Sequence, residues 1–307
     1  MITNVSPQNA AFLQGIDRIQ QTISVASNQV TSGLRITQAS DAPDQIGNLL
    51  QLRANQVHNT QVQSNLTLAQ TDAQAADDAL TSSIQIMDTA TALASQGATA
   101  TATATGRASI AQQVQSILQQ MVSNSQTNVQ GSFIFSGDRD TSPQYTWDAT
   151  QANPVVTQQT TASTRQIENP AGGTFQASLT AQQIFDDRDP VSGGPATDNV
   201  FNALNTLVTT LNNNDTAGIT NSITLLQAAS VHLNTSQSFY GNLENQIQNA
   251  NTYASNYDVQ LKTDISNIQD ADIPSAASEL TLANTQLQAA MQMQGQKPHS
   301  SLFSYLG

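Results

Sequence analysis

Apolar residues near both ends of the chain recur at the three- and four-residue spacing of a coiled-coil helix. A stripe this narrow is the seam along which one helix buries itself against another. The amino-terminal stripe comprises Ile2, Val5, Phe12, Ile16, Ile19, Ile23, Ala26 and Val30. A second stripe repeats every seven residues and comprises Leu226, Leu233, Tyr240, Ile247, Ala254, Leu261 and Ile268. The pattern predicts that both ends of the chain are long helices that pair with other helices.

Residues that begin and end helices divide the first part of the chain into three helices. Gly33 ends the first of them, which we expect over about residues 6–32. Ser40 or Asp41 is a suitable cap for a second helix, with Pro43 in its first turn and Gly97 at its end. The Ala–Thr alternation over 98–105 has the period of a strand, but we interpret it as a loop because helices flank it. The third helix is expected to extend to about residue 129.

The character of the chain changes at Gly131. The run from Gly131 to Gly137 is aromatic and β-branched between glycines, which predicts a strand. The pairs Val155–Val156 and Thr174–Phe175 fit further short strands between turns. The sequence therefore predicts a small β-rich middle domain over residues 131–197.

Helix returns after this middle domain. Asp198 is a plausible cap for a helix, and the longest predicted helix covers about residues 219–268, which corresponds to roughly 75 Å. Asp272 caps the last helix, with Pro274 in its first turn. A compact domain of this size has a radius of gyration of only about 19 Å, so the predicted fold is a mainly α elongated rod. In it, long terminal helices form a coiled-coil bundle with a small β-rich middle domain.

These elements predict five consecutive segments. Residues 1–35 form an amino-terminal assembly helix, and residues 36–130 belong to a helical bundle. The β-rich domain follows over 131–197, and the bundle resumes over 198–270. A carboxy-terminal assembly helix covers residues 271–307.

The charge of the chain excludes several classes of function. Its formal net charge is −13, and its nine basic residues include only two lysines, Lys262 and Lys297. Without a basic stripe, binding to nucleic acid or to an anionic membrane is not expected. The chain has no cysteine, which excludes disulfides and thiolate sites. The first charged residue is Asp17 and apolar runs are short, so we expect neither a signal peptide nor a transmembrane span.

Candidate catalytic and metal-binding residues are sparse. The three histidines, His58, His232 and His299, are far apart in the sequence, and we interpret each as a solvated residue. The acidic group of Asp186, Asp187 and Asp189 is either a Ca²⁺-binding loop or, as we favour, a solvated turn. No phosphate-binding loop, nucleophile elbow or zinc-protease helix is present. We predict no catalytic residue, no cofactor and no metal ligand, and therefore a protein that is not an enzyme.

Several segments together resemble the flagellin superfamily. Residues 31–36 (TSGLRI) and 39–43 (ASDAP) resemble the family's helix–turn–helix signature, although Ala42 stands where the family often has an acidic residue. Other segments are more similar to the hook-associated proteins of the hook–filament junction than to filament flagellin. These are residues 131–137 (GSFIFSG), 143–145 (PQY), 184–186 (IFD), 287–290 (LQAA), 293–295 (MQG) and 301–306 (SLFSYL).

The resemblance implies a structural subunit of the bacterial flagellum that joins hook to filament by helical self-assembly of its terminal coiled coils. Such proteins are secreted through the flagellar type III export channel and lie outside the cell. The implied partners are further copies of the chain in a ring or helical stack, a neighbouring hook-associated protein on the hook side, flagellin or another hook-associated protein on the filament side, and an export chaperone. The alternatives are a filament-forming flagellin and an unrelated coiled-coil adhesin or phage tail component.

The apolar stripes then divide into two sets. The residues that we expect at the subunit interface are Ile2, Val5, Phe12, Ile16, Ile19, Ile23, Val30, Leu280, Leu287, Met291, Leu302, Phe303 and Leu306. The residues that we expect in the bundle core within one chain are Leu80, Ile84, Met87, Ile117, Leu233, Leu243, Ile247, Tyr257, Leu261 and Ile268. The first set is predicted to remain unsatisfied until neighbouring subunits cover it.

Overall fold

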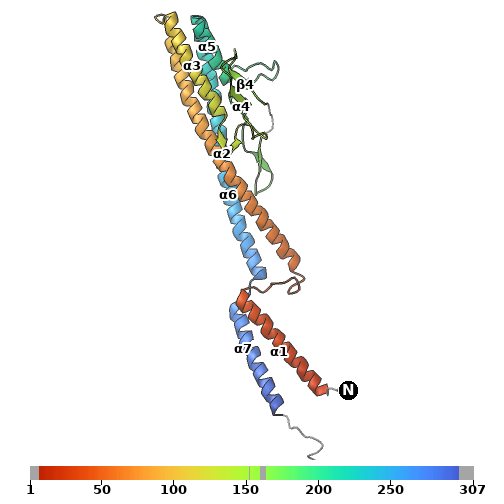
Figure 1. Cartoon of the computed structure of the whole chain (residues 1–307). Coiled ribbons are helices and arrows are strands. Elements are labelled where there is room, and N and C mark those ends of the chain that lie inside the picture. Colours follow the sequence, from red (N-terminus) through yellow and green to blue (C-terminus); the bar gives the residue numbers. More distant parts are fainter. Residues whose placement is uncertain (1–6, 152, 160–163, 297–307) are drawn as a thin grey trace, which may run out of the picture. The chain divides into compact units, whose positions relative to one another are not determined.

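The structure is a computed structural model that describes residues 7–151, 153–159 and 164–296 (Figure 1). The chain folds as two compact units. The terminal unit comprises the described residues up to His58 and from Tyr257 onward, and the central unit comprises those between Asn59 and Asn256. Each unit is considered by itself below.

Long helices form most of the chain, as the apolar stripes predicted. The helices are α1 (Pro7–Ser32), α2 (Ile46–Ala98), α3 (Ala104–Ser125), α4 (Ala181–Phe185), α5 (Val200–Asn212), α6 (Thr216–Gln269) and α7 (Ile273–Gly295). With 53 residues in α2 and 54 in α6, each of these two helices is about 80 Å long. The predicted mainly α class with a small β-rich middle part is confirmed.

Three small antiparallel sheets of two strands each lie between α3 and α4. Strand β1 (Asn128–Val129) pairs with β2 (Ser132–Phe133), β3 (Tyr145–Trp147) with β4 (Val155–Thr157), and β5 (Gln166–Glu168) with β6 (Thr174–Gln176). The β1–β2 turn consists of Gln130 and Gly131, which both have positive φ as a tight two-residue hairpin requires. A two-stranded sheet is marginal alone, so these hairpins depend on the helices that they cover.

The core of the central unit lies where α6 meets α2, α3 and α5. Leu226, Leu233, Tyr240 and Ile247, which follow one another at seven-residue intervals on α6, are all buried there. The hairpin segment, defined as the described residues from β1 to β6 (128–176), adds Ile134 and Phe135, and α4 adds Ile184 and Phe185. One continuous apolar core therefore joins the hairpin segment to the helices.

Several predicted element boundaries were wrong by a few residues. The third helix ends at Ser125 rather than near residue 129, because Asn128 and Val129 pair with β2 instead. The predicted strand over 131–137 is reduced to Ser132 and Phe133. The Ala–Thr tract forms a turn that ends at Thr103, whose side chain caps α3 by accepting from the Gly106 amide at 3.0 Å. Asp272 caps α7 as predicted, accepting from the Ser275 amide at 3.2 Å.

A buried arginine joins two chain reversals in the central unit. Arg107 donates to the carbonyl oxygens of Gly97 and Thr99 at 2.8 and 3.0 Å, in the α2–α3 connection. It also donates to the Asn214 Oδ1 atom at 2.5 Å, in the α5–α6 connection. The guanidinium thus satisfies carbonyl groups at the end of α2 that the helix leaves without a partner.

Candidate assembly interface

Helices α1 and α7 form an antiparallel pair in the terminal unit (Figure 1). The carboxyl end of α1 is joined to the amino end of α7 by a bridge between Leu34 and Asp270. Ala26, Ala276 and Ala283 are the only fully buried side chains among the described residues of α1 and α7. The pair therefore has a seam but no closed core of large side chains.

The residues predicted at the subunit interface fall into three groups. The half-buried residues, all on the paired helices α1 and α7, are Phe12, Ile16, Ile19, Ile23, Val30, Leu280 and Leu287. Met291 is 61% exposed. Outside the described residues lie Ile2, Val5, Leu302, Phe303 and Leu306.

The structure adds exposed apolar residues that the stripe did not identify. Large apolar side chains of the pair that face solvent over about half of their surface or more are Leu13 (54%), Val25 (55%), Leu282 (58%) and Met293 (71%). Leu282 and Met293 are eleven residues apart, which is close to three full turns, so they share one face of α7. These residues could have been found in the sequence, because they are apolar and lie outside the heptad stripe. A helix exposed to solvent normally has polar residues at such positions. The pair thus presents apolar surface beyond its own seam.

A compact turn connects α1 to α2 and holds the end of α6. Arg35 donates from its guanidinium to the Ile268 carbonyl at 2.5 Å and to Gln45 Oε1 at 2.8 Å, and its amide donates to the Gln269 carbonyl at 2.6 Å. Under this polar layer, Ile36, Ala42 and Leu49 form a small buried cluster against Ile265 and Ile268. The segment over residues 31–43, which resembles the family signature, therefore contacts both the start of α2 and the end of α6 within the terminal unit.

Asp41 stabilises this turn and does not cap the second helix, which corrects the expectation from the sequence. Its Oδ2 atom accepts hydrogen bonds from the amides of Thr37 and Gln38 at 2.9 and 2.8 Å and from the Thr37 hydroxyl at 3.0 Å. Helix α2 begins only at Ile46. The two backbone hydrogen bonds, with that of the Thr37 hydroxyl, lower the pKa of the exposed Asp41 carboxyl below its ordinary value.

This lowered pKa predicts a pH-dependent contribution to stability. A carboxyl with a lower pKa in the folded than in the unfolded state stabilises the fold above its unfolded pKa. That stabilisation disappears as the pH falls below about 4 and through the folded pKa. We expect Asp41→Asn to lower the thermal midpoint of the full-length protein at pH 7, and the difference from wild type to shrink at pH 3. Asp44→Asn, an exposed neighbour, serves as the control in circular-dichroism melts, and a pH-independent difference would contradict this assignment.

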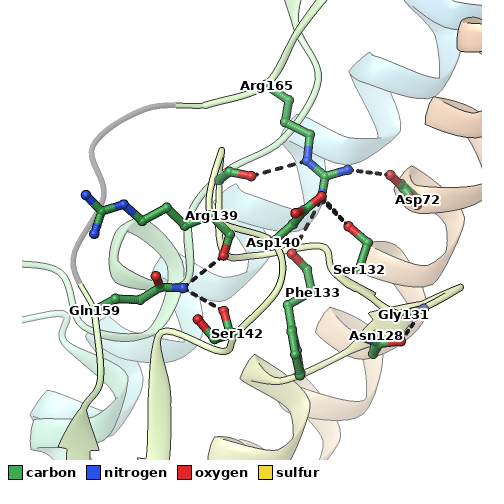
Figure 2. Close-up of polar contacts among 11 residues, drawn as sticks. Asp72, Asn128, Gly131, Ser132, Phe133, Arg139, Asp140, Ser142, Gln159 and Arg165 are labelled. Atoms are coloured by element: carbon green, nitrogen blue, oxygen red, sulfur yellow. Dashed lines mark hydrogen bonds and ion pairs between the residues drawn. The ribbon is translucent and has the colours of Figure 1, made fainter.

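In the central unit, Arg165 attaches the hairpin segment to α2. Its guanidinium forms an ion pair with Asp72 at 2.9 Å and donates to the Ser132 hydroxyl at 3.2 Å and to the Phe133 carbonyl at 3.4 Å (Figure 2). Asp140 lies 3.8 Å from the same guanidinium. Burial raises the pKa of Asp72, and Arg165 offsets part of that shift. Through these contacts Arg165, which directly precedes β5, links β2 to α2.

A cavity of about 190 Å³ adjoins Arg165. Its wall includes Leu68 and Asp72 of α2, Ile134 and Tyr240. The Tyr240 hydroxyl is buried and accepts a hydrogen bond from the Leu179 amide at 3.1 Å, and burial raises its pKa. The tyrosine therefore remains protonated and serves as a hydrogen-bonding member of the core.

In the acidic group of Asp186, Asp187 and Asp189, the Asp186 carboxylate is buried and hydrogen-bonded within the protein. Asp186 is 7% exposed and accepts hydrogen bonds from the Tyr145 hydroxyl at 2.8 Å, from the Arg188 guanidinium at 2.7 Å and from the Asn199 amide group at 2.8 Å. Asp189 instead accepts from the amides of the following turn, which lowers its pKa. The interpretation of Asp186 as a solvated turn residue was thus wrong, because the carboxylate lies in the interior with its own partners.

His232 is also not the solvated residue that the sequence suggested. It is half-buried on α6, with its Nε2 atom 2.8 Å from the Gln183 carbonyl oxygen and its Nδ1 atom 3.2 Å from Asp198 Oδ2. This contact removes Asp198 from the capping role that we expected. Asn199 caps α5 in its place, accepting from the Asn202 amide at 2.8 Å.

The residues predicted in the bundle core lie in both units. Buried residues of the central unit are Leu80, Met87, Ile117, Leu233, Leu243 and Ile247, and Ile84 packs against them half-buried. In the terminal unit Leu261 is buried, Tyr257 is half-buried, and Ile268 packs under the α1–α2 turn.

Among the helices of the described residues, none combines the length and the apolar character that a membrane-spanning helix requires.

Comparison with known proteins gives two family matches. The model of the bacterial flagellin N-terminal helical region matches residues 3–140, and that of the bacterial flagellin C-terminal helical region matches residues 223–306. No curated protein sequence matches the chain.

Solved structures with the same fold include a putative flagellar hook-associated protein from Vibrio parahaemolyticus, which is 19% identical with a TM-score of 0.63 over 75% of this chain and 100% of that one. FlgL from Bacillus cereus is 16% identical, with a TM-score of 0.53 over 72% of this chain and 100% of that one. Flagellar hook associated protein-3 from Legionella pneumophila is 13% identical, with a TM-score of 0.61 over 73% of this chain and 99% of that one. At these identities the likeness establishes the fold.

Proposed function

The chain belongs to the flagellin family, and on that premise we propose that it is a structural subunit of the bacterial flagellum at the hook–filament junction. In this role it joins hook to filament by helical self-assembly of its terminal helices. The observation that carries the proposal is the incomplete burial of the α1–α7 pair. Apart from three alanines, its described apolar side chains are half-buried or exposed.

Assembly is what such a surface favours. Burial of apolar area contributes roughly 25 cal/mol per Å², so exposed leucine, valine and methionine side chains on two paired helices provide a driving force for association. Contacts with neighbouring copies would cover Leu13, Val25, Leu282, Met291 and Met293 and complete the core that a single pair lacks. We propose that residues 1–35 and 271–307 are the assembly segments, and that residues 36–130 and 198–270 form the bundle, with residues 131–197 as the middle domain.

The position at the junction rests on likeness to hook-associated proteins in both sequence motifs and fold. A filament-forming flagellin is the alternative, since it belongs to the same family. An unrelated adhesin or phage tail component is not compatible with the family membership. The family is structural, and we propose that this chain performs no catalysis.

The proposed partners follow from the proposed position. They are further copies of the chain in a ring or helical stack, a neighbouring hook-associated protein on the hook side, and flagellin or another hook-associated protein on the filament side. We propose that the chain is secreted through the flagellar export channel, held beforehand by an export chaperone, and that it works outside the cell. Neither nucleic acid nor a membrane is among its proposed partners.

A seeding experiment distinguishes a junction protein from a flagellin. Purified full-length protein is mixed either with its own sheared aggregates or with isolated hooks that carry the hook-side hook-associated protein. Electron microscopy should show a short cap on the hooks, with no long filament from the seeds. Flagellin added afterwards should extend only from capped hooks.

Flagellin from the same cells, treated in the same way, is the control for conditions that permit polymerisation. Long filaments of the protein grown from its own seeds would show that it is a filament flagellin. Failure to bind hooks under conditions in which flagellin polymerises would count against any junction role.

A further inference from the structure

Three side chains with metal-binding atoms converge in the central unit. Asp187 follows α4, Asp198 precedes the cap of α5, and His232 lies on α6. One ligand atom of each lies within 4.8 Å of the others, and all three residues are half-buried. His232 is 34 and 45 residues away in sequence from the two aspartates, so tertiary folding assembles the group.

A backbone contact fixes the orientation of the His232 ring. The Nε2 atom lies 2.8 Å from the Gln183 carbonyl oxygen, which can only accept, so Nε2 carries the hydrogen and donates it. In the neutral ring, Nδ1 then presents its lone pair to Asp198 Oδ2, 3.2 Å away. A lone pair that faces a carboxylate oxygen at this distance is repulsive unless a proton or a metal ion lies between the two atoms. A backbone carbonyl on the far nitrogen is also the usual way in which proteins orient a ligating histidine.

The two carboxylates are short of positive charge. No described residue donates a hydrogen bond to the Asp187 carboxylate or pairs with it, and no lysine or arginine among the described residues pairs with Asp198, whose carboxylate contacts His232 Nδ1. Arg188 is the adjacent cation, but its guanidinium is directed to Asp186 and to the Gly193 carbonyl. A cation bound between these two carboxylates would therefore displace no lysine or arginine side chain.

We propose that Asp187, Asp198 and His232 bind a divalent transition-metal ion, with Zn²⁺ as the preferred ion and water as a fourth ligand. In a tetrahedral zinc site with bonds of about 2.0–2.1 Å, adjacent ligand atoms are roughly 3.3 Å apart, close to the Nδ1–Oδ2 distance here. Imidazole with carboxylates suits zinc, whereas Ca²⁺ requires six to eight oxygen ligands. The ion would tie the connection between α4 and α5 to α6.

Zinc titration of the full-length protein tests this site. After treatment with EDTA, calorimetric titration with ZnCl₂ should show one zinc ion per chain, and saturating zinc should raise the thermal midpoint by roughly 5 °C. In Asp187→Asn, both effects should be lost. Asp88→Asn, the same change at an exposed carboxylate elsewhere on the central unit, should respond to zinc as wild type does.

The metal-free variants distinguish a ligand from a structural residue. Because the Asp187 carboxylate has no partner to lose, Asp187→Asn in EDTA should melt at or above the wild-type temperature. His232→Gln, which retains a donor for the Gln183 carbonyl, should also lose the zinc response. A wild-type midpoint that zinc does not change, or zinc binding that survives in both variants, would overturn the proposal.

Discussion

Replacement of Phe135 by alanine is expected to destabilise the central unit by about 3–5 kcal/mol, the usual cost of removing a fully buried phenylalanine ring. The ring of Phe135 makes edge-to-face contacts with Phe185 and Tyr240, at centroid distances of 5.9 and 6.3 Å. Its backbone carbonyl also accepts from the Ala181 amide at 2.7 Å, which places α4. The substitution therefore leaves a cavity where the hairpin segment, α4 and α6 meet.

Two signals in a thermal melt measure this loss of stability. Trp147, the single tryptophan, reports on β3, and the far-ultraviolet circular dichroism reports on the helices. Both transitions should shift down by roughly 6–20 °C, because a unit of this size loses about 2–4 °C per kcal/mol. Val231→Ala, at an exposed site on α6, should change stability by less than about 0.5 kcal/mol. A Phe135→Ala protein that melts like the control would show that the aromatic contacts do not hold the hairpin segment.

Glutamate at both Leu282 and Met293 is expected to abolish assembly while the monomer stays folded. The two side chains are 58% and 71% exposed, so the change costs the monomer about 0.5 kcal/mol per site or less. In an assembled interface each carboxylate would lose its hydration, at several kcal/mol per charge. We therefore expect the concentration needed for half-maximal binding to hooks to rise more than about a hundredfold.

The matched control introduces the same charges on the same helix. Asn284→Glu with Gln288→Glu places two glutamates at exposed polar positions of α7. This double variant should co-sediment with hooks at near wild-type concentrations, and both variants should have wild-type circular dichroism. Equal loss of binding in the two variants would point to charge as the cause, and would contradict an apolar docking face made by Leu282 and Met293.

The long helices could be predicted because their apolar period is visible along the chain. The seven-residue series from Leu226 to Ile247 is buried throughout, since a side chain repeated every two turns returns to the same face of the helix. Helix caps were predicted correctly where the capping side chain and the amide that donates to it are close in sequence, as with Asp272 and Ser275. Periodicity and local caps together were enough for the fold class.

Helix starts were predicted incorrectly where a capping side chain had a competing partner. Asp41 accepts hydrogen bonds from residues before it in the chain, and Asp198 contacts His232 across the unit. Sequence patterns identify residues that are able to cap, but they do not rank one partner against another. The same limit applies to the convergence of Asp187, Asp198 and His232, since only tertiary packing brings α6 to the connection between α4 and α5.

The apolar stripe of α1 predicted only part of the candidate interface. A coiled-coil period identifies the face that meets the first partner, and in this chain that partner is α7. Residues for a further partner must lie off the stripe, as Leu13, Val25 and Leu282 do. The heptad period of a helix therefore predicts one contact surface. A second contact surface can be found only from the side chains that stay exposed in the folded helix pair.

Arg107 has a consequence for where the chain can change in length. Its guanidinium joins Gly97, Thr99 and Asn214, so an added or deleted residue in either of these reversals would displace an acceptor and leave a buried charge without its partner. The β5–β6 turn differs, since Ala171, Gly172 and Gly173 are exposed and a change of length there leaves no buried charge without a partner, although the positive φ of both glycines disfavours their substitution. Insertions should accordingly be tolerated at this hairpin and rejected at the helix reversals.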